Sequence, residues 1–121
     1  MADVQRNRFR KANAVSNKRL ALARKFLESS GRDEFLEALT KALWGYLSDK
    51  FNIDPSNLSR DNIRELLLNR GVEEEIIHNF IETIDNAEFL RFAPGTGDGD
   101  LNHLLTRSEQ VIVSIEKTYR R

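Results

Sequence analysis

The chain has 121 residues, of which 40% are hydrophobic, and it contains no cysteine. A chain of this length can bury a single core without metals, and the lack of cysteine excludes disulfides, thiol catalysis and cysteine metal sites. The net charge is zero, but residues 1–25 hold eight Lys or Arg against one acid, Asp3, so +7 in this stretch is balanced by −7 in the remainder.

A basic arm, residues 1–12, precedes the first predicted helix, residues 13–28. We expect the arm to be unstructured and the helix to stop at Gly31, a glycine C-cap. The apolar positions of this helix share one side: Val15, Leu22, Ala23 and Phe26.

The second predicted helix, residues 34–51, starts after a capping Asp33 and follows the first so closely that the two should form an antiparallel hairpin. It is apolar on two sides, which is typical of a central helix buried by neighbours on both. One stripe holds Phe35, Leu39, Ala42, Leu43 and Tyr46, and the other holds Thr40, Trp44, Leu47 and Phe51.

Trp44, the only tryptophan, lies about 140° from the first stripe of this helix. We expect it to pack in the core, with Gly45 admitting a closely packed neighbour in spite of a cost of about 1 kcal/mol for glycine in a helix interior. The alternative is an exposed aromatic anchor for a partner, formed by Trp44 and Phe51.

After the second helix, Asp54 and Pro55 predict one short turn, since a side-chain cap is followed by proline at the first helical position. Ser59 is then expected to cap a third helix, residues 60–69, which ends at Gly71.

The fourth predicted helix, residues 73–92, begins with three glutamates, which suit the positive end of a helix dipole. Pro94 and a glycine-rich loop break it before a closing helix, residues 101–119, with the cleanest apolar stripe of the chain. Strand alternation is not sustained outside these segments. The predicted fold is therefore all-α, a single-domain bundle of about five helices over residues 13–121.

Two charged residues of the fourth helix fall where its core face should be. Arg91 lies at the centre of the apolar face and Glu88 at its border. One interpretation is structural, an i, i+3 ion pair or an arginine whose stem covers the core. The other is a charged hot spot that faces a partner.

The sequence offers little for catalysis or metal binding. His78 stands in a Glu-x-x-His spacing, but His78 and His103 both fall on the polar sides of their helices, where we expect them to face water. A partial calcium-loop pattern, residues 98–109, has His103 where the sharp turn needs glycine. We therefore expect no catalytic residue, no metal and no cofactor.

The basic residues of the arm, Arg6, Arg8, Arg10 and Lys11, suit a segment that follows a spanning helix on the cytoplasmic side of a membrane. The alternative is a helical DNA-binding or regulatory domain that uses the arm, although only Phe9 is placed to stack on a base. Such a regulator should carry its basic charge on a folded recognition helix, not ahead of the helices. The apolar runs are too short to span a bilayer, so we expect this chain to be soluble.

Several runs occur in an order that is more specific than helical periodicity. They are KAN (11–13), KALWGYLSDK (41–50), LSRDNI (58–63), RGV (70–72) and EFLRFAP (88–94). With them the chain resembles, over most of its length, the C-terminal region of BatD, a membrane protein of bacterial aerotolerance operons. Members of this family often have a cysteine before the Glu-Phe pair, where this chain has Ala87.

The resemblance implies a helical tail at the cytoplasmic face of the bacterial inner membrane, tethered by an upstream spanning helix. It implies protein partners among von Willebrand-type membrane proteins and a MoxR-like ATPase, and it brings no catalytic residues. We therefore expect a non-enzymatic docking domain with a role in oxygen tolerance or envelope stress, and no nucleic-acid partner.

Overall fold

The computed structural model describes residues 2–29, 31–93 and 101–118, without the side chains of residues 2–10. This part of the chain forms no strand and five α-helices: α1 (Ala2–Glu28), α2 (Arg32–Phe51), α3 (Ile63–Asn69), α4 (Glu74–Phe92) and α5 (Leu101–Thr118). A short 3-10 helix, η1 (Pro55–Asn57), follows α2. The predicted all-α bundle of about five helices is confirmed.

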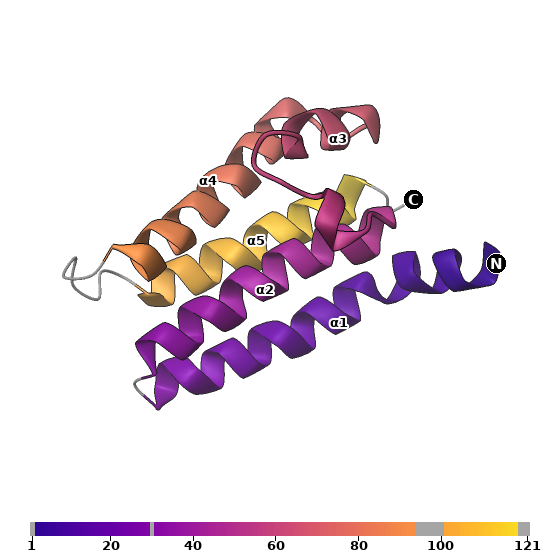
Figure 1. Ribbon diagram of the computed structural model, residues 1–121. Coiled ribbons are helices and arrows are strands. Elements are labelled where there is room, and N and C mark those ends of the chain that lie inside the picture. Colours follow the sequence, from indigo (N-terminus) through magenta and orange to yellow (C-terminus); the bar gives the residue numbers. More distant parts are fainter. Residues whose placement is uncertain (1, 30, 94–100, 119–121) are drawn as a thin grey trace.

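The four long helices run alternately in opposite directions (Figure 1). α1 and α2 form the expected antiparallel hairpin, and α4 and α5 form a second hairpin that lies against it. α2 contacts α1, α4 and α5, so it is the central helix of the bundle. η1 and α3 connect the end of α2 to the start of α4, and α3 packs on α4.

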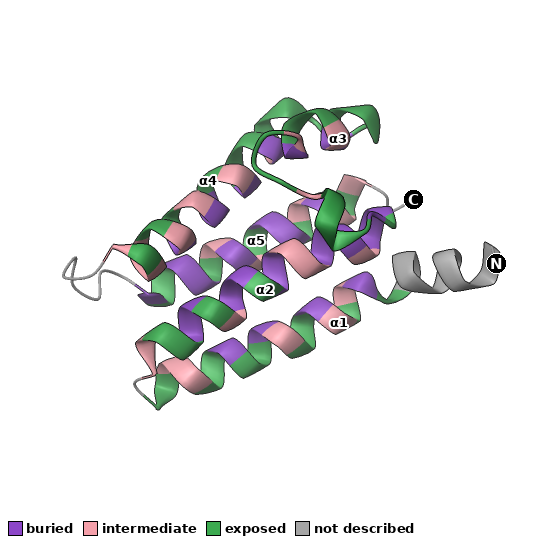
Figure 2. Cartoon of the chain, in the orientation of Figure 1, coloured by how far each residue is buried: buried purple, intermediate pink, exposed green. Residues whose placement is uncertain are grey.

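α2 is buried on more than one side, as its two apolar stripes predict (Figure 2). Thr40, Leu47 and Phe51 of the second stripe are 3%, 0% and 3% exposed. The alternative, a surface anchor that includes Phe51, is therefore wrong. Arg70, the residue that follows α3, donates from Nη1 to the Phe51 carbonyl oxygen at 3.0 Å.

The first helix begins at Ala2, so the expected start at residue 13 and the expected unstructured arm are wrong. Arginine and lysine are good helix formers, and residues 2–12 contain neither glycine nor proline to stop the helix. Ala12 is fully buried in the core. The sequence argument against a DNA-binding regulator was that the basic residues lie ahead of the helices. That argument is wrong as well, because the basic segment belongs to a folded helix.

The buried face of α1 also differs from the expected one. Leu22 is 50% exposed, and the residues that face the core are Ala12, Ser16, Leu20 and Ala23. Three of these four are small, which allows the backbones of α1 and α2 to approach closely. Ser16 satisfies its hydroxyl locally by donating to the Asn13 carbonyl oxygen at 2.8 Å.

α2 begins at a tight turn held by backbone hydrogen bonds, without a side-chain cap. Gly31 is the N-cap residue, without a side-chain hydrogen bond, so the expected cap at Asp33 is wrong. The Gly31 N–H donates to the Phe26 carbonyl oxygen at 2.7 Å, and its own carbonyl oxygen accepts from the Phe35 N–H. One glycine thus closes α1 and opens α2.

The cap at Asp54 is confirmed, since its carboxylate accepts from the Ser56 N–H at 2.9 Å. The expected cap at Ser59 is wrong, and Asn62 precedes α3 instead. The Asn62 side chain accepts from the Ser59 N–H at 3.0 Å, which holds a turn where the sequence predicted the first helical residues. Gly71 ends the α3 region with φ +85°, as expected for a glycine stop.

Candidate interaction surfaces

Trp44 is half-buried: it packs against the core and also lines an open groove of about 510 Å³ between α1, α2 and η1. Trp44 therefore packs against the core, as expected, and is also accessible at the surface. We call this hollow the Trp44 groove. Its lining residues are Arg19, Lys41, Trp44, Gly45, Ser48, Pro55 and Leu58.

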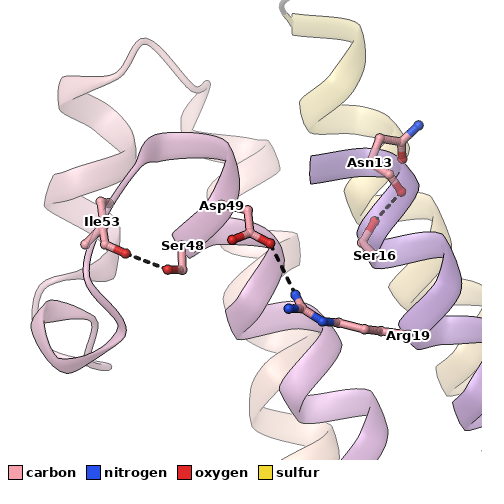
Figure 3. Close-up of polar contacts among 6 residues, drawn as sticks. All are labelled: Asn13, Ser16, Arg19, Ser48, Asp49 and Ile53. Atoms are coloured by element: carbon pink, nitrogen blue, oxygen red, sulfur yellow. Dashed lines mark hydrogen bonds and ion pairs between the residues drawn. The ribbon is translucent and has the colours of Figure 1, made fainter. Parts of the chain in front are cut away.

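Gly45 admits a close neighbour, as expected, and the neighbour is the side chain of Arg19 from α1. A Cβ at position 45 would collide with the Arg19 guanidinium. The guanidinium lies across the glycine toward Asp49, with 3.4 Å between Nη1 and Oδ2 (Figure 3). The side chains of Arg19 and Asp49 are 41% and 23% exposed, so solvent screens this pair.

The other cation of the groove, Lys41, pairs with Glu37 one turn earlier at 3.0 Å. The hydrogen bond from Lys41 and its charge, together with the charge of Arg91, lower the pKa of Glu37. Both side chains are largely exposed, at 72% for Lys41 and 48% for Glu37.

The far wall of the groove is positioned by a tight reversal after α2. Ser48 Oγ donates to the Ile53 carbonyl oxygen at 2.5 Å, and the Ile53 N–H donates to the Ser48 carbonyl oxygen at 3.0 Å (Figure 3). Asn52 makes the turn with φ 52°, a left-handed conformation that asparagine tolerates well. The chain therefore doubles back and brings Pro55 and Leu58 beside α2.

A second candidate surface lies at the end of α4, where Phe89 and Phe92 are 62% and 68% exposed. We call it the Phe89/Phe92 face. The Arg91 guanidinium carbon stands 4.9 Å from the centre of the Phe92 ring. The exposure of these two rings was not predicted from the sequence. Their signal was an i, i+3 pair of large aromatics that falls outside the core stripe of its helix.

Arg91 is half-buried, as its position on the apolar face suggested, and its Nη1 reaches Thr40 Oγ1 of α2 at 3.5 Å. Among the contacts of the described residues, Arg91 is joined to Thr40 and Phe92 and not to Glu88. The carbonyl oxygen of Leu90 near the helix end is reached by Arg32 of α2, whose Nη2 donates to it at 2.8 Å.

A buried polar cluster joins α2 to α5. Lys50, with a side chain only 4% exposed, places Nζ 2.9 Å from Oε2 of Glu116. The Tyr46 hydroxyl donates to the same carboxylate oxygen. A buried cation held by a carboxylate and a phenol is well suited to fixing two helices together, because breaking one partner leaves the others uncompensated.

The remaining candidates contribute no further site. His78, paired with Glu82 at 3.0 Å, and His103 are both exposed, as expected. Within the described residues, no three or more metal-binding side chains gather and no helix is long and apolar enough to cross a membrane. Positions 98–100 of the calcium-loop pattern lie outside the described residues.

Of the basic arm, the structure describes the side chain of Lys11, which is exposed. The side chains of Arg6, Arg8 and Arg10 lie outside the described part, although their backbone belongs to α1.

Comparisons with known proteins give no relative: no protein family, curated protein or solved structure matches the chain. The resemblance to the BatD tail therefore stays a prediction that rests on the sequence motifs.

Proposed function

We propose that the chain is a non-enzymatic docking domain that binds protein partners through the Phe89/Phe92 face. The observation that carries this proposal is the exposure of both rings, 62% and 68%. Most large apolar side chains of α4 are at least half-buried, so two adjacent exposed phenylalanines are a feature that the fold itself does not need.

The chemistry of this face suits protein binding. Burying a phenylalanine side chain is worth roughly 1.5–3 kcal/mol, and aromatic residues with arginine dominate interface hot spots. Arg91 is already held against Thr40 and beside the Phe92 ring, which limits the entropy it would lose on binding.

The placement at a membrane and the partner classes come from the resemblance to the BatD tail. The proposed site is the cytoplasmic face of the bacterial inner membrane, and the proposed partners are von Willebrand-type proteins and a MoxR-like ATPase. α1, at 27 residues, outruns α2, at 20. α1 ends and α2 begins at the same connection, so the difference in length lies at the basic N-terminal end of α1. That end can extend about 10 Å beyond α2, as a juxtamembrane stalk would.

The test measures binding of the purified MoxR-like ATPase, and of the soluble von Willebrand domains encoded with it, to the chain by biolayer interferometry. Phe89→Ser with Phe92→Ser should weaken binding to one of them at least tenfold. The matched control is Leu22→Ser with Val113→Ser, which removes two other exposed apolar side chains, 50% and 46% exposed. Equal effects of the two double variants, or no binding by the parent chain, would contradict the proposal.

A second candidate function is favoured by the helical backbone of the basic segment, since nucleic-acid recognition commonly uses a basic helix. Fluorescence polarisation with duplex DNA at 50 mM salt separates the two. Binding that weakens steeply with salt and disappears when Arg6, Arg8 and Arg10 become glutamine would favour the DNA-binding function.

A further inference from the structure

The Trp44 groove is a different surface from the Phe89/Phe92 face, and we propose that it binds an acidic linear peptide that inserts a large apolar side chain. This inference goes beyond the docking function above, because the two surfaces are formed by different elements and can be occupied separately. Three features of the groove carry it: its aromatic wall, its charge and the way its arginine is held.

The apolar part of the groove is made by Trp44, Pro55 and Leu58. A hollow of about 510 Å³ is within the usual size range of ligand sites, and a half-buried indole offers a rigid surface for an apolar side chain. The groove is bordered by α2, by Arg19 of α1 and by Pro55 and Leu58 of the segment after α2, so a bound peptide can contact all three parts of the chain.

The charged residues among those that line the groove are both cations, Arg19 and Lys41. Their carboxylate partners are Asp49, in a part-buried pair at 3.4 Å, and Glu37, in an exposed pair at 3.0 Å. Such pairs contribute about 0–1 kcal/mol, so an incoming carboxylate can replace either partner at little cost. Because only two cations are among the residues that line it, the groove suits a short carboxylate-bearing segment better than a nucleic acid, whose binding needs an extended basic surface.

Gly45 gives the site its preorganisation. Without a Cβ at this position, the Arg19 guanidinium lies against α2 at Gly45 and points toward Asp49, where it lines the groove (Figure 3). A glycine in a helix interior costs about 1 kcal/mol relative to alanine, and here the space it leaves is filled by a cation. Gly45 is therefore a positioning residue for ligand binding.

The test uses the complete chain and two acetylated hexapeptides, Glu-Glu-Phe-Leu-Glu-Glu and Lys-Lys-Phe-Leu-Lys-Lys. Trp44 is the only tryptophan, so its fluorescence reports directly on the groove. The acidic peptide should give a saturable change in Trp44 emission and a shift of the Gly45 amide in the NMR spectrum. The basic peptide should give neither.

Lys41→Glu should weaken binding of the acidic peptide about tenfold, and Gly45→Ala should weaken it by displacing Arg19. The matched control is Arg24→Gln, which removes another exposed arginine of α1 that pairs with Glu109 outside the groove. Circular dichroism confirms that each variant is folded.

Three outcomes would overturn the proposal: no saturable response to the acidic peptide, equal responses to the two peptides, or equal losses in Lys41→Glu and Arg24→Gln. A fourth is self-association, seen as a doubled mass in sedimentation that Trp44→Ala abolishes, because the groove would then hold a second copy of the chain. None of these outcomes depends on Phe89 or Phe92, so the docking proposal stands or falls separately.

Discussion

Two consecutive residues of α2 form ion pairs of opposite character. Lys50 meets Glu116 of α5 at 2.9 Å with side chains 4% and 16% exposed. Asp49, one residue earlier, meets Arg19 of α1 at 3.4 Å with side chains 23% and 41% exposed. A rotation of about 100° around the helix thus separates an ion pair inside the core from an ion pair that is partly exposed to solvent.

The difference in burial decides what each pair can do. The buried pair must stay closed, because an unpartnered charge in the interior costs several kcal/mol. The partly exposed pair, which solvent screens, gains less from staying closed, so its cation can exchange partners more easily. α2 therefore has a fixed side, where Lys50 meets α5, and an adaptable side, where Asp49 and Lys41 lie beside the Trp44 groove, and substitutions can test how far the two sides differ.

The largest effect is expected for Lys50→Met, which leaves the Glu116 carboxylate buried beside Tyr46 without its cation. The free energy of unfolding, measured by urea denaturation at pH 7, should fall by about 3 kcal/mol. Arg19→Ala, which breaks the partly exposed pair with Asp49, should lower the free energy of unfolding by about 1 kcal/mol or less.

A double variant, Lys50→Met with Glu116→Leu, removes both charges and should recover much of the lost stability, since apolar residues of similar size replace buried pairs well. If Lys50→Met cost no more than Arg19→Ala, burial would not separate the two sides of α2, and the comparison would fail.

An intermediate effect is expected for Arg91→Ala, since Arg91 is half-buried and contacts Thr40 at 3.5 Å. Loss of this contact and of the arginine stem over the core should lower the free energy of unfolding by about 1 kcal/mol. Arg64→Ala, which breaks an exposed pair with Glu74, is the control and should change it by less than about 0.5 kcal/mol. An unchanged melting temperature with lost partner binding would instead assign Arg91 to the interface.

The sequence was sufficient where one periodicity dominated. α5 follows its predicted stripe because apolar residues recur every three to four positions, and Leu101, Leu105 and Ile112 are all buried. The two-sided pattern of α2 likewise predicted a central helix. The predicted start of α1 was too late in the sequence because its first turns carry basic residues and no apolar stripe. The helix propensity of these residues could have indicated the earlier start.

The interaction surfaces were harder to predict because they depend on tertiary contacts. Nothing near Lys50 in the sequence shows that Glu116, on another helix, accepts from it in the core. Gly45 was correctly interpreted as a place of close approach, but its neighbour could not be named until α1 and α2 were in register. The exposure of Phe89 likewise depends on which face of α4 meets α2 and α5.

A smaller effect is expected for Gly45→Ala on the adaptable side. Alanine gains about 1 kcal/mol of helix propensity but displaces Arg19, whose pair with Asp49 contributes about 0–1 kcal/mol. The free energy of unfolding should therefore stay the same or rise slightly. In the Arg19→Ala background nothing is displaced, and the full gain should appear in a double-mutant cycle. A loss of more than about 1 kcal/mol in both backgrounds would show that Gly45 makes room for something other than Arg19.

The smallest effect concerns an exposed pair of α2, Glu37 with Lys41, and it shows whether this pair is formed in solution. The pKa of Glu37 should lie below its ordinary 4.5. The hydrogen bond from Lys41 favours the charged carboxylate most, followed by the positive charge of Lys41 and then that of Arg91. A carboxyl whose folded pKa is lowered stabilises the fold above 4.5 and loses that contribution as the pH falls through the folded value. An NMR titration of the Glu37 carboxyl should show the pKa returning toward 4.5 in Lys41→Ala, and less so in Arg91→Ala. A pKa of 4.5 in the parent chain would mean that Lys41 is free of Glu37 in solution, which would make the adaptable side of α2 more open than the structure shows.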